Sequence, residues 1–177
     1  GDYKDSYGKS QAFLWEAGSM QSLGALSSKP QSTAFAINDS GQIVGHSWNG
    51  GDNTDQLATL FDKSGGGDNI NLGTLGGIKS TALAINNAGQ VVGVSKTPSS
   101  GGYYATKFDI TGNQQNLQIG PAGSRATSIN NNEVPVGFAL IGGYYRHYQW
   151  MKFDITGGNS YELLGGGSGY SNGARSI

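Results

Sequence analysis

The stretch STAFAINDSGQIVGHS (residues 32–47) returns 48 residues further on as STALAINNAGQVVGVS (residues 80–95). A third and more divergent copy, SRATSINNNEVPVGFA, occupies residues 124–139, and the sequence closes on GARSI (173–177), which matches the start of the pattern. In each complete copy, apolar residues alternate with small or polar ones on both sides of an Asn-containing turn. Alternation around such turn formers predicts a β-hairpin.

Two further segments recur with this hairpin. One ends in an aromatic residue followed by an acid, as in ATLFD (58–62), and the other is a short apolar segment around a leucine, as in NLGTLGG (71–77). With the hairpin they predict four antiparallel strands in a unit of about 46 residues, which is typical of propeller blades. The residues at fixed phase are predicted to form the core. They are Ile37, Ile85, Ile129 and Ile177, then Trp15, Phe61, Phe108 and Phe153, then Leu23, Leu72, Leu117 and Leu163.

We therefore expect an all-β, β-propeller-like fold of about four such repeats. The single repeat domain spans residues 1–177. It divides into a partial repeat (1–30), repeats at 31–77, 78–121 and 122–166, and a partial repeat at 167–177. Gly1 is in phase with the glycine of the VVG motif, so the two partial repeats are complementary. Either they complete a shared unit in a closed four-bladed ring, or the chain is a section of a longer array.

Composition narrows the class of function. The chain has 177 residues, of which 31 are Gly, and a formal net charge of −1, so the basic surface expected of a nucleic-acid binder is missing. It contains no cysteine, which excludes disulfides and thiolate chemistry. No apolar run reaches the roughly 18 residues that would predict a membrane-spanning helix, and no signal peptide opens the sequence.

The repeated motifs resemble the HAF repeats of bacterial extracellular proteins. The resemblance lies in AFAIN and ALAIN, in QIVGHS and QVVGVS, in QAFLWE with Gln11 in place of the family's His, and in LGTLGG at residues 72–77. It covers essentially the whole chain. What it implies is a secreted or surface-exposed bacterial protein, with no activity attached.

The third copy departs from this pattern at its turn and second strand. Glu133 stands where Gly41 and Gly89 stand in the other copies, and Pro135 enters the second strand. Because proline lacks the backbone N–H that a sheet needs, Pro135 predicts an edge position or a bulge.

The segment between the second and third strands varies most, and it collects aromatic residues among Gly and Ser. Tyrosine and tryptophan with polar tips can stack on sugar faces or contact another protein. The candidate ligand-binding residues are Trp48, Tyr103, Tyr104, Tyr144, Tyr145, Arg146, His147 and Tyr148. The alternative for any one tyrosine is packing against the neighbouring unit.

Other residues are weaker candidates for chemistry. Asp52 and Asp55 could offer oxygen ligands to calcium, but their spacing is not that of an EF-hand. The acids that follow the aromatic marker recur in every unit, which indicates a structural role such as bonding a neighbouring turn. They are Glu16, Asp62, Asp109 and Asp154. Hydrolase and phosphate-binding motifs are absent, and no cofactor or metal is predicted.

Three hypotheses for function follow. The first is a noncatalytic extracellular binding module that takes a polysaccharide, a glycoconjugate or another surface partner through its Tyr-rich loops. The second is a structural component that self-associates through open strand edges near Gly1 and Ile177. The third and most distant is a propeller-type hydrolase.

Overall fold

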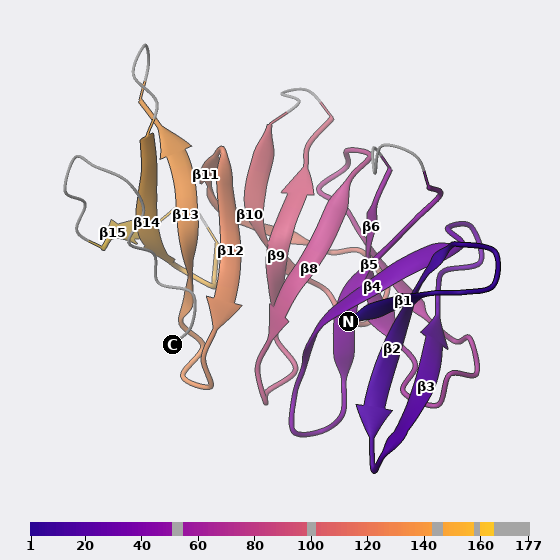
Figure 1. The fold of residues 1–177 in the computed structure, drawn as a ribbon. Helices are drawn as coiled ribbons and strands as arrows, with labels where there is room; N and C mark the ends of the chain where they lie inside the picture. Colours follow the sequence, from indigo (N-terminus) through magenta and orange to yellow (C-terminus); the bar gives the residue numbers. More distant parts are fainter. Residues whose placement is uncertain (51–54, 99–101, 143–146, 158–159, 165–177) are drawn as a thin grey trace.

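The computed structural model describes residues 1–50, 55–98, 102–142, 147–157 and 160–164. These residues form four antiparallel sheets, numbered here in chain order (Figure 1). Sheet 1 holds β1 (Asp2–Lys4), β2 (Ser10–Glu16) and β3 (Ser19–Gly24); sheet 2 holds β4 (Gln31–Ile37), β5 (Ile43–Trp48), β6 (Leu57–Phe61) and β7 (Ile70–Gly73). Sheet 3 holds β8 (Ser80–Ile85), β9 (Val91–Lys96), β10 (Tyr103–Phe108) and β11 (Leu117–Ala122); sheet 4 holds β12 (Ser124–Ile129), β13 (Pro135–Ile141), β14 (His147–Phe153) and β15 (Tyr161–Leu163).

The all-β prediction is confirmed. Within each sheet every strand pairs with the next one along the chain, and sheets 2, 3 and 4 each have four strands. The sheets follow one another in a row, with sheets 1 and 4 at its two ends (Figure 1). The described residues form no closed ring. They contain no helix, and hence none able to cross a membrane.

A glycine on the second strand of each four-stranded sheet allows a close approach of the first strand. The first strand bulges at this point, between Ala34 and Ala36 in sheet 2. A Cβ atom added to Gly45 would lie 2.0 Å from the carbonyl oxygen of Thr33. Gly93 and Gly137 face the same obstruction from Thr81 and Arg125. The repeated glycine is therefore required by backbone contact across a β-bulge.

The hydrophobic core is divided among the joints, by which we mean the interfaces between successive sheets. At the first joint, Ala12 and Leu23 of sheet 1 pack with Ala34, Ile43 and Phe61 of sheet 2. The other two joints repeat this arrangement, with Phe108 and Phe153 in the place of Phe61. Each sheet thus buries the aromatic marker of the sheet that follows it.

Four of the predicted core residues that the structure describes are exposed, and Ile177 lies outside the described residues. Trp15 is 64% exposed because no described sheet lies in front of sheet 1, and Ile37 is 50% exposed at the first joint. Leu117 is 37% exposed because Ile119, two residues later, takes the buried place that Leu72 has in sheet 2. Leu163, on the last strand of sheet 4, is 52% exposed.

At every joint, a buried serine hydroxyl forms hydrogen bonds to the preceding sheet. In sheet 3, Ser80 donates to the carbonyl of Gly73 at 2.6 Å and accepts the N–H of Ala58 at 2.9 Å. Ser32 and Ser124 make the equivalent pairs of bonds to the sheets before them. All three serines are at most 1% exposed. The hydroxyls satisfy backbone groups that are left free where the register shifts between the last two strands of the preceding sheet.

Asparagine amides join the sheets at the turn between first and second strands. The side-chain oxygen of Asn38 accepts the N–H of Gln42 and so closes its own turn, as the sequence predicts. Its amide nitrogen also donates to the carbonyl of Asn86 in the next sheet, at 3.0 Å. Asn86 makes the same bond to the carbonyl of Asn130, at 3.1 Å. The turns of sheets 2, 3 and 4 are therefore linked in series.

A structural role was predicted for all four acids after the aromatic marker, and three of them bond the turn that directly follows them. Asp109 accepts the backbone N–H and the hydroxyl of Thr111, and Asp154 binds Thr156 in the same way. Asp62 accepts from Ser64 and Gly66. Glu16 differs, since it forms an exposed ion pair with Lys63 at 2.8 Å.

Pro135 corrects an expectation. It lies neither on an edge strand nor at a bulge of its own strand, because β13 pairs with strands on both sides. Pro135 is the first residue of β13 and is paired only with Ile129. At this position the missing N–H costs the sheet little.

We predict that Ser80→Ala lowers the free energy of unfolding by about 1–3 kcal/mol, because it leaves two buried backbone groups without a partner. Denaturant unfolding followed by tryptophan fluorescence measures the change. Ser28→Ala, at an exposed serine, is the matched control and should be nearly neutral. Equal stability of the two variants would show that the hydroxyl bridge does not hold the joint.

A second prediction concerns the turn of the third repeat. Gly41 and Gly89 have φ angles of 77° and 78°, and Glu133 adopts 63° in their place. A side chain in this left-handed region is strained, so Glu133→Gly is expected to stabilise the protein by about 0.5–1 kcal/mol. The reciprocal variant Gly89→Glu should destabilise it by a similar amount. A decrease in melting temperature for Glu133→Gly would contradict this explanation.

Candidate binding surface

The connections between second and third strands emerge at one edge of the row, which is the upper edge of sheets 2, 3 and 4 in Figure 1. We call this the loop edge; its described flanking residues include Trp48 and Asn49 in sheet 2, Lys96 and Tyr103 in sheet 3, and Ile141 and His147 in sheet 4. Three of the predicted site residues, Tyr144, Tyr145 and Arg146, lie outside the described residues, as does Asp52.

Trp48 offers little surface to a ligand. It is 8% exposed, and its ring lies 4.9 Å from that of His46 on the same strand. On the other side of His46, the ring of Phe35 lies 5.2 Å away. The three rings therefore form a row of tilted contacts across β4 and β5, in which Phe35 is half-exposed and the other two are buried.

His46 lies in the middle of this row. The side-chain amide nitrogen of Gln56 lies 3.1 Å from Nε2 of His46. Nδ1 is buried and has no hydrogen-bond partner among the described residues. Burial lowers the pKa of His46 to about 4, with a smaller contribution from the positive charge of Lys79 and an opposing one from Asp2.

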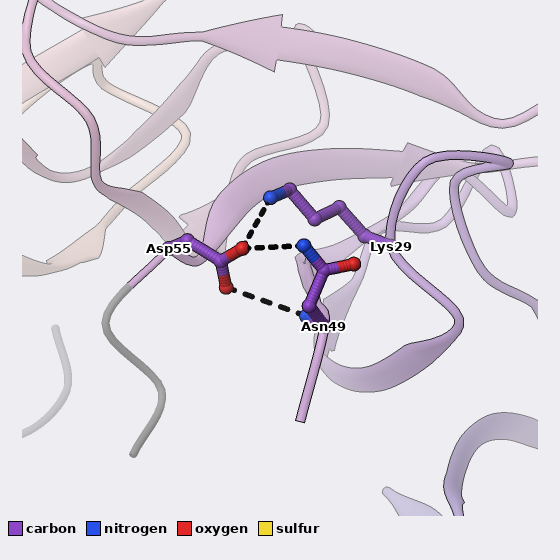
Figure 2. Close-up of polar contacts among 3 residues, drawn as sticks. All are labelled: Lys29, Asn49 and Asp55. Atoms are coloured by element: carbon purple, nitrogen blue, oxygen red, sulfur yellow. Dashed lines mark hydrogen bonds and ion pairs between the residues drawn. The ribbon is translucent and has the colours of Figure 1, made fainter. Parts of the chain in front are cut away.

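Asp55 is occupied by protein donors, as Figure 2 shows. Its carboxylate forms an ion pair with Lys29 at 2.5 Å and accepts hydrogen bonds from the backbone and side-chain nitrogens of Asn49. The bond from Lys29, chiefly, holds the pKa of Asp55 below its usual value. Within the described part of the chain, no group of three or more potential metal ligands is found. Asp55 thus ties the loop edge of sheet 2 to the connection from sheet 1.

Tyr103 lies between two cations. The Nζ atom of Lys96, its neighbour on β9, is 5.0 Å from the ring centroid, and the guanidinium of Arg125, from sheet 4, is 4.8 Å from it. These cation–π contacts use the ring of Tyr103 to join sheets 3 and 4. Both Tyr103 and Tyr104 are half-buried. For Tyr103, the packing alternative describes the structure better than ligand contact does.

Tyr148 is the exposed aromatic among the described candidates. It is 66% exposed, and beside it His147 is exposed as well. Its ring meets that of Phe138 edge-on at 5.2 Å, and Phe138 in turn meets Trp150 at 5.4 Å. Phe138 pairs with Trp150 across β13 and β14, and Leu140 pairs with Tyr148. Since residues two apart on a strand share a face, Phe138, Tyr148 and Trp150 form one aromatic face of sheet 4.

This aromatic face breaks the symmetry of the repeat. By strand register, Trp150 occupies the position of Ala58 and Ala105, which are fully buried at their joints. Phe138 likewise takes the position of Val94. Sequence reasoning did not single out Phe138 or Trp150, although an alanine-to-tryptophan change at a repeated position is visible in WMKFD beside ATKFD.

The buried histidine yields a pH prediction. Between about pH 6.5 and 4 the unfolded chain binds a proton at His46 and the folded chain does not, so stability should fall as the pH is lowered through this window. The full loss from this group is about 3 kcal/mol. His46→Val, which copies Val94 of the next sheet, should remove this part of the acid sensitivity in urea unfolding measured at pH 7.5, 5.5 and 4.5. His147→Gln, at the exposed second histidine, should keep the acid sensitivity of the unmodified chain. If His46→Val and the unmodified chain lose stability in parallel as the pH falls, His46 does not cause the acid sensitivity.

No protein-family model, no curated protein and no solved structure matches this chain. The resemblance to HAF repeats accordingly remains a prediction from the motifs, and the case for a function rests on the geometry of the residues described above.

Proposed function

We propose that this chain is a noncatalytic binding module that takes a glycan on the aromatic face of sheet 4. The observation that carries the proposal is Tyr148, which is 66% exposed and whose ring meets that of Phe138, which in turn meets Trp150. A ring held by a neighbouring ring loses little conformational entropy when a ligand stacks on it.

The chemistry of the face suits a sugar. One side of a pyranose ring presents C–H groups, which pack on an aromatic ring, while its hydroxyls need polar partners at the rim. The phenol of Tyr148 supplies such a partner, and this side chain is exposed. A single shallow face of this kind predicts weak affinity per site, raised when several sites act on one polymer.

The absence of catalysis is part of the same proposal. Catalytic carboxylates need an unusual environment, often with a raised pKa. In Asp62, Asp109 and Asp154 the pKa is lowered instead, mainly by hydrogen bonds from the hydroxyls of Ser64, Thr111 and Thr156 in their own turns. These recurrent acids are committed to structure, which favours a binding role over a hydrolase.

The site of action is proposed from the repeat motifs. The likeness to HAF repeats supports an exported bacterial protein that meets its ligand outside the cell or on the cell surface. Self-association is a second candidate function, favoured by the exposure of Trp15 and Ile37 at the sheet 1 end of the row.

The test is a titration of the intact chain with soluble oligosaccharides of glucose, N-acetylglucosamine and galactose. Binding should change the fluorescence of Trp150 and shift its indole resonance. Tyr148→Ala is expected to weaken binding at least tenfold, equivalent to about 1.4 kcal/mol.

Tyr7→Ala is the matched control, because Tyr7 is 86% exposed in the corresponding connection of sheet 1 but has no ring contact among the described residues. It should leave the affinity unchanged. The proposal fails if no sugar of the panel binds, or if the two variants weaken binding equally.

A further inference from the structure

Asn49 and Gly50 form an Asn-Gly pair directly after β5, at the loop edge of sheet 2. Asn49 is exposed, and the backbone N–H of Gly50 forms no hydrogen bond to a described residue. Gly50 has a φ angle of 93°, in the region that favours glycine. Because glycine has no Cβ atom, nothing on residue 50 shields its backbone nitrogen from the side chain of Asn49.

An asparagine in this setting can lose its side-chain amide without an enzyme. The backbone nitrogen of the next residue attacks the side-chain carbonyl carbon and forms a new C–N bond. The bond to the side-chain nitrogen breaks, and this nitrogen leaves as ammonia with the proton of the backbone N–H. The succinimide ring then takes up one water molecule and opens at either carbonyl, to aspartate or isoaspartate. The net reaction exchanges an amide for a carboxylate and needs only water.

The asparagines that close the repeated turns are protected from this reaction. Asn38 and Asn86 are at most 8% exposed, and the side-chain oxygen of each accepts a backbone N–H in its own turn. Each is followed by a residue with a side chain rather than by glycine. Asn49 combines exposure with a glycine neighbour. The sequence has one other Asn-Gly pair, at Asn172, which lies outside the described residues.

Asp55 and Lys29 hold Asn49 in the folded chain (Figure 2). The carboxylate of Asp55 accepts the side-chain nitrogen of Asn49 at 2.6 Å and its backbone nitrogen at 3.3 Å. Lys29 pairs with the same carboxylate at 2.5 Å and keeps it in place. Because the side-chain nitrogen leaves during the reaction, its hydrogen bond to Asp55 is lost on the way to the product. The ion pair therefore slows the reaction for as long as it stays closed.

We propose that Asn49 is a site of spontaneous deamidation and that the ion pair between Lys29 and Asp55 controls its rate. The conversion runs one way. In the aspartate product an oxygen replaces the nitrogen that lay 2.6 Å from Asp55, so two carboxylates meet where a donor met an acceptor. Like charges at this distance repel, and the single charge of Lys29 cannot offset both. The link between the loop edge of sheet 2 and the connection from sheet 1 then opens and does not re-form.

The experiment follows the intact chain in mildly alkaline buffer, with peptide mapping by mass spectrometry at intervals. Fragmentation of each peptide locates the exchanged amide and separates aspartate from isoaspartate. Lys29→Gln removes the ion pair and should raise the rate at Asn49 about two- to fivefold, the range that an ion pair near the surface contributes. Asp55→Ala, which removes the hydrogen bonds as well, should raise the rate further.

Lys63→Gln is the matched control, because it breaks an ion pair to Glu16 away from the loop edge. It should leave the rate at Asn49 unchanged. Asn172 is measured in the same samples, so that rates at Asn49 are compared under one set of conditions. The proposal is overturned if Asn49 stays intact in Lys29→Gln and Asp55→Ala, or if Lys29→Gln and Lys63→Gln react at equal rates at Asn49.

Asn49→Asp carries the aspartate product from the start and tests the opening of the link. At neutral pH it should melt at a lower temperature than Asn49→Ser, which loses the amide without gaining a charge. The difference should vanish in acid, where the carboxylates are protonated. Equal melting temperatures at neutral pH would show that the exchange does not open the link. Tyr148 lies on sheet 4, so neither measurement depends on the proposed glycan site.

Discussion

The joint bridged by a buried serine hydroxyl is the contact on which this structure depends. A sheet of three or four short strands cannot bury enough apolar surface alone, so each one needs its neighbour. Ser32, Ser80 and Ser124 set how closely two sheets approach, because each bonds the last two strands of the sheet before it. The alanines at each joint and the aromatic marker of the following sheet fill the remaining space between the two sheets.

Residues that recur in every repeat and residues that differ between repeats have different roles in this chain. Residues that recur serve the joints and turns, including acids that in isolation would resemble catalytic groups. Departures concentrate at the two ends of the row. Trp150 replaces a buried alanine on sheet 4, and Trp15, in the position of three buried phenylalanines, is exposed on sheet 1. The surfaces with free apolar area are those where the scaffold has no described neighbour.

The antiparallel four-stranded sheets could be predicted from the sequence because three copies carry the same spacing, and spacing decides strands and turns. The backbone conformation of Glu133 could be predicted in the same way, because the other two copies have glycine at its position and glycine is typical of a positive φ angle. Exposure could not be predicted, because Trp15 and Phe61 have the same local pattern and differ only in whether a sheet covers them. The role of Tyr103 depends on Arg125 from another sheet, and no local motif reports such a partner.

The amide relay from Asn38 through Asn86 to Asn130 has a consequence for how the chain unfolds. Asn86 accepts from one sheet while it donates to the next, so a turn that opens removes a bond from both neighbours. Nearest-neighbour coupling of this kind makes an array lose order from its ends inward rather than by melting one internal unit. The middle sheet should therefore exchange its amide protons most slowly, and a proteolytic cut at either end would leave the remaining sheets folded.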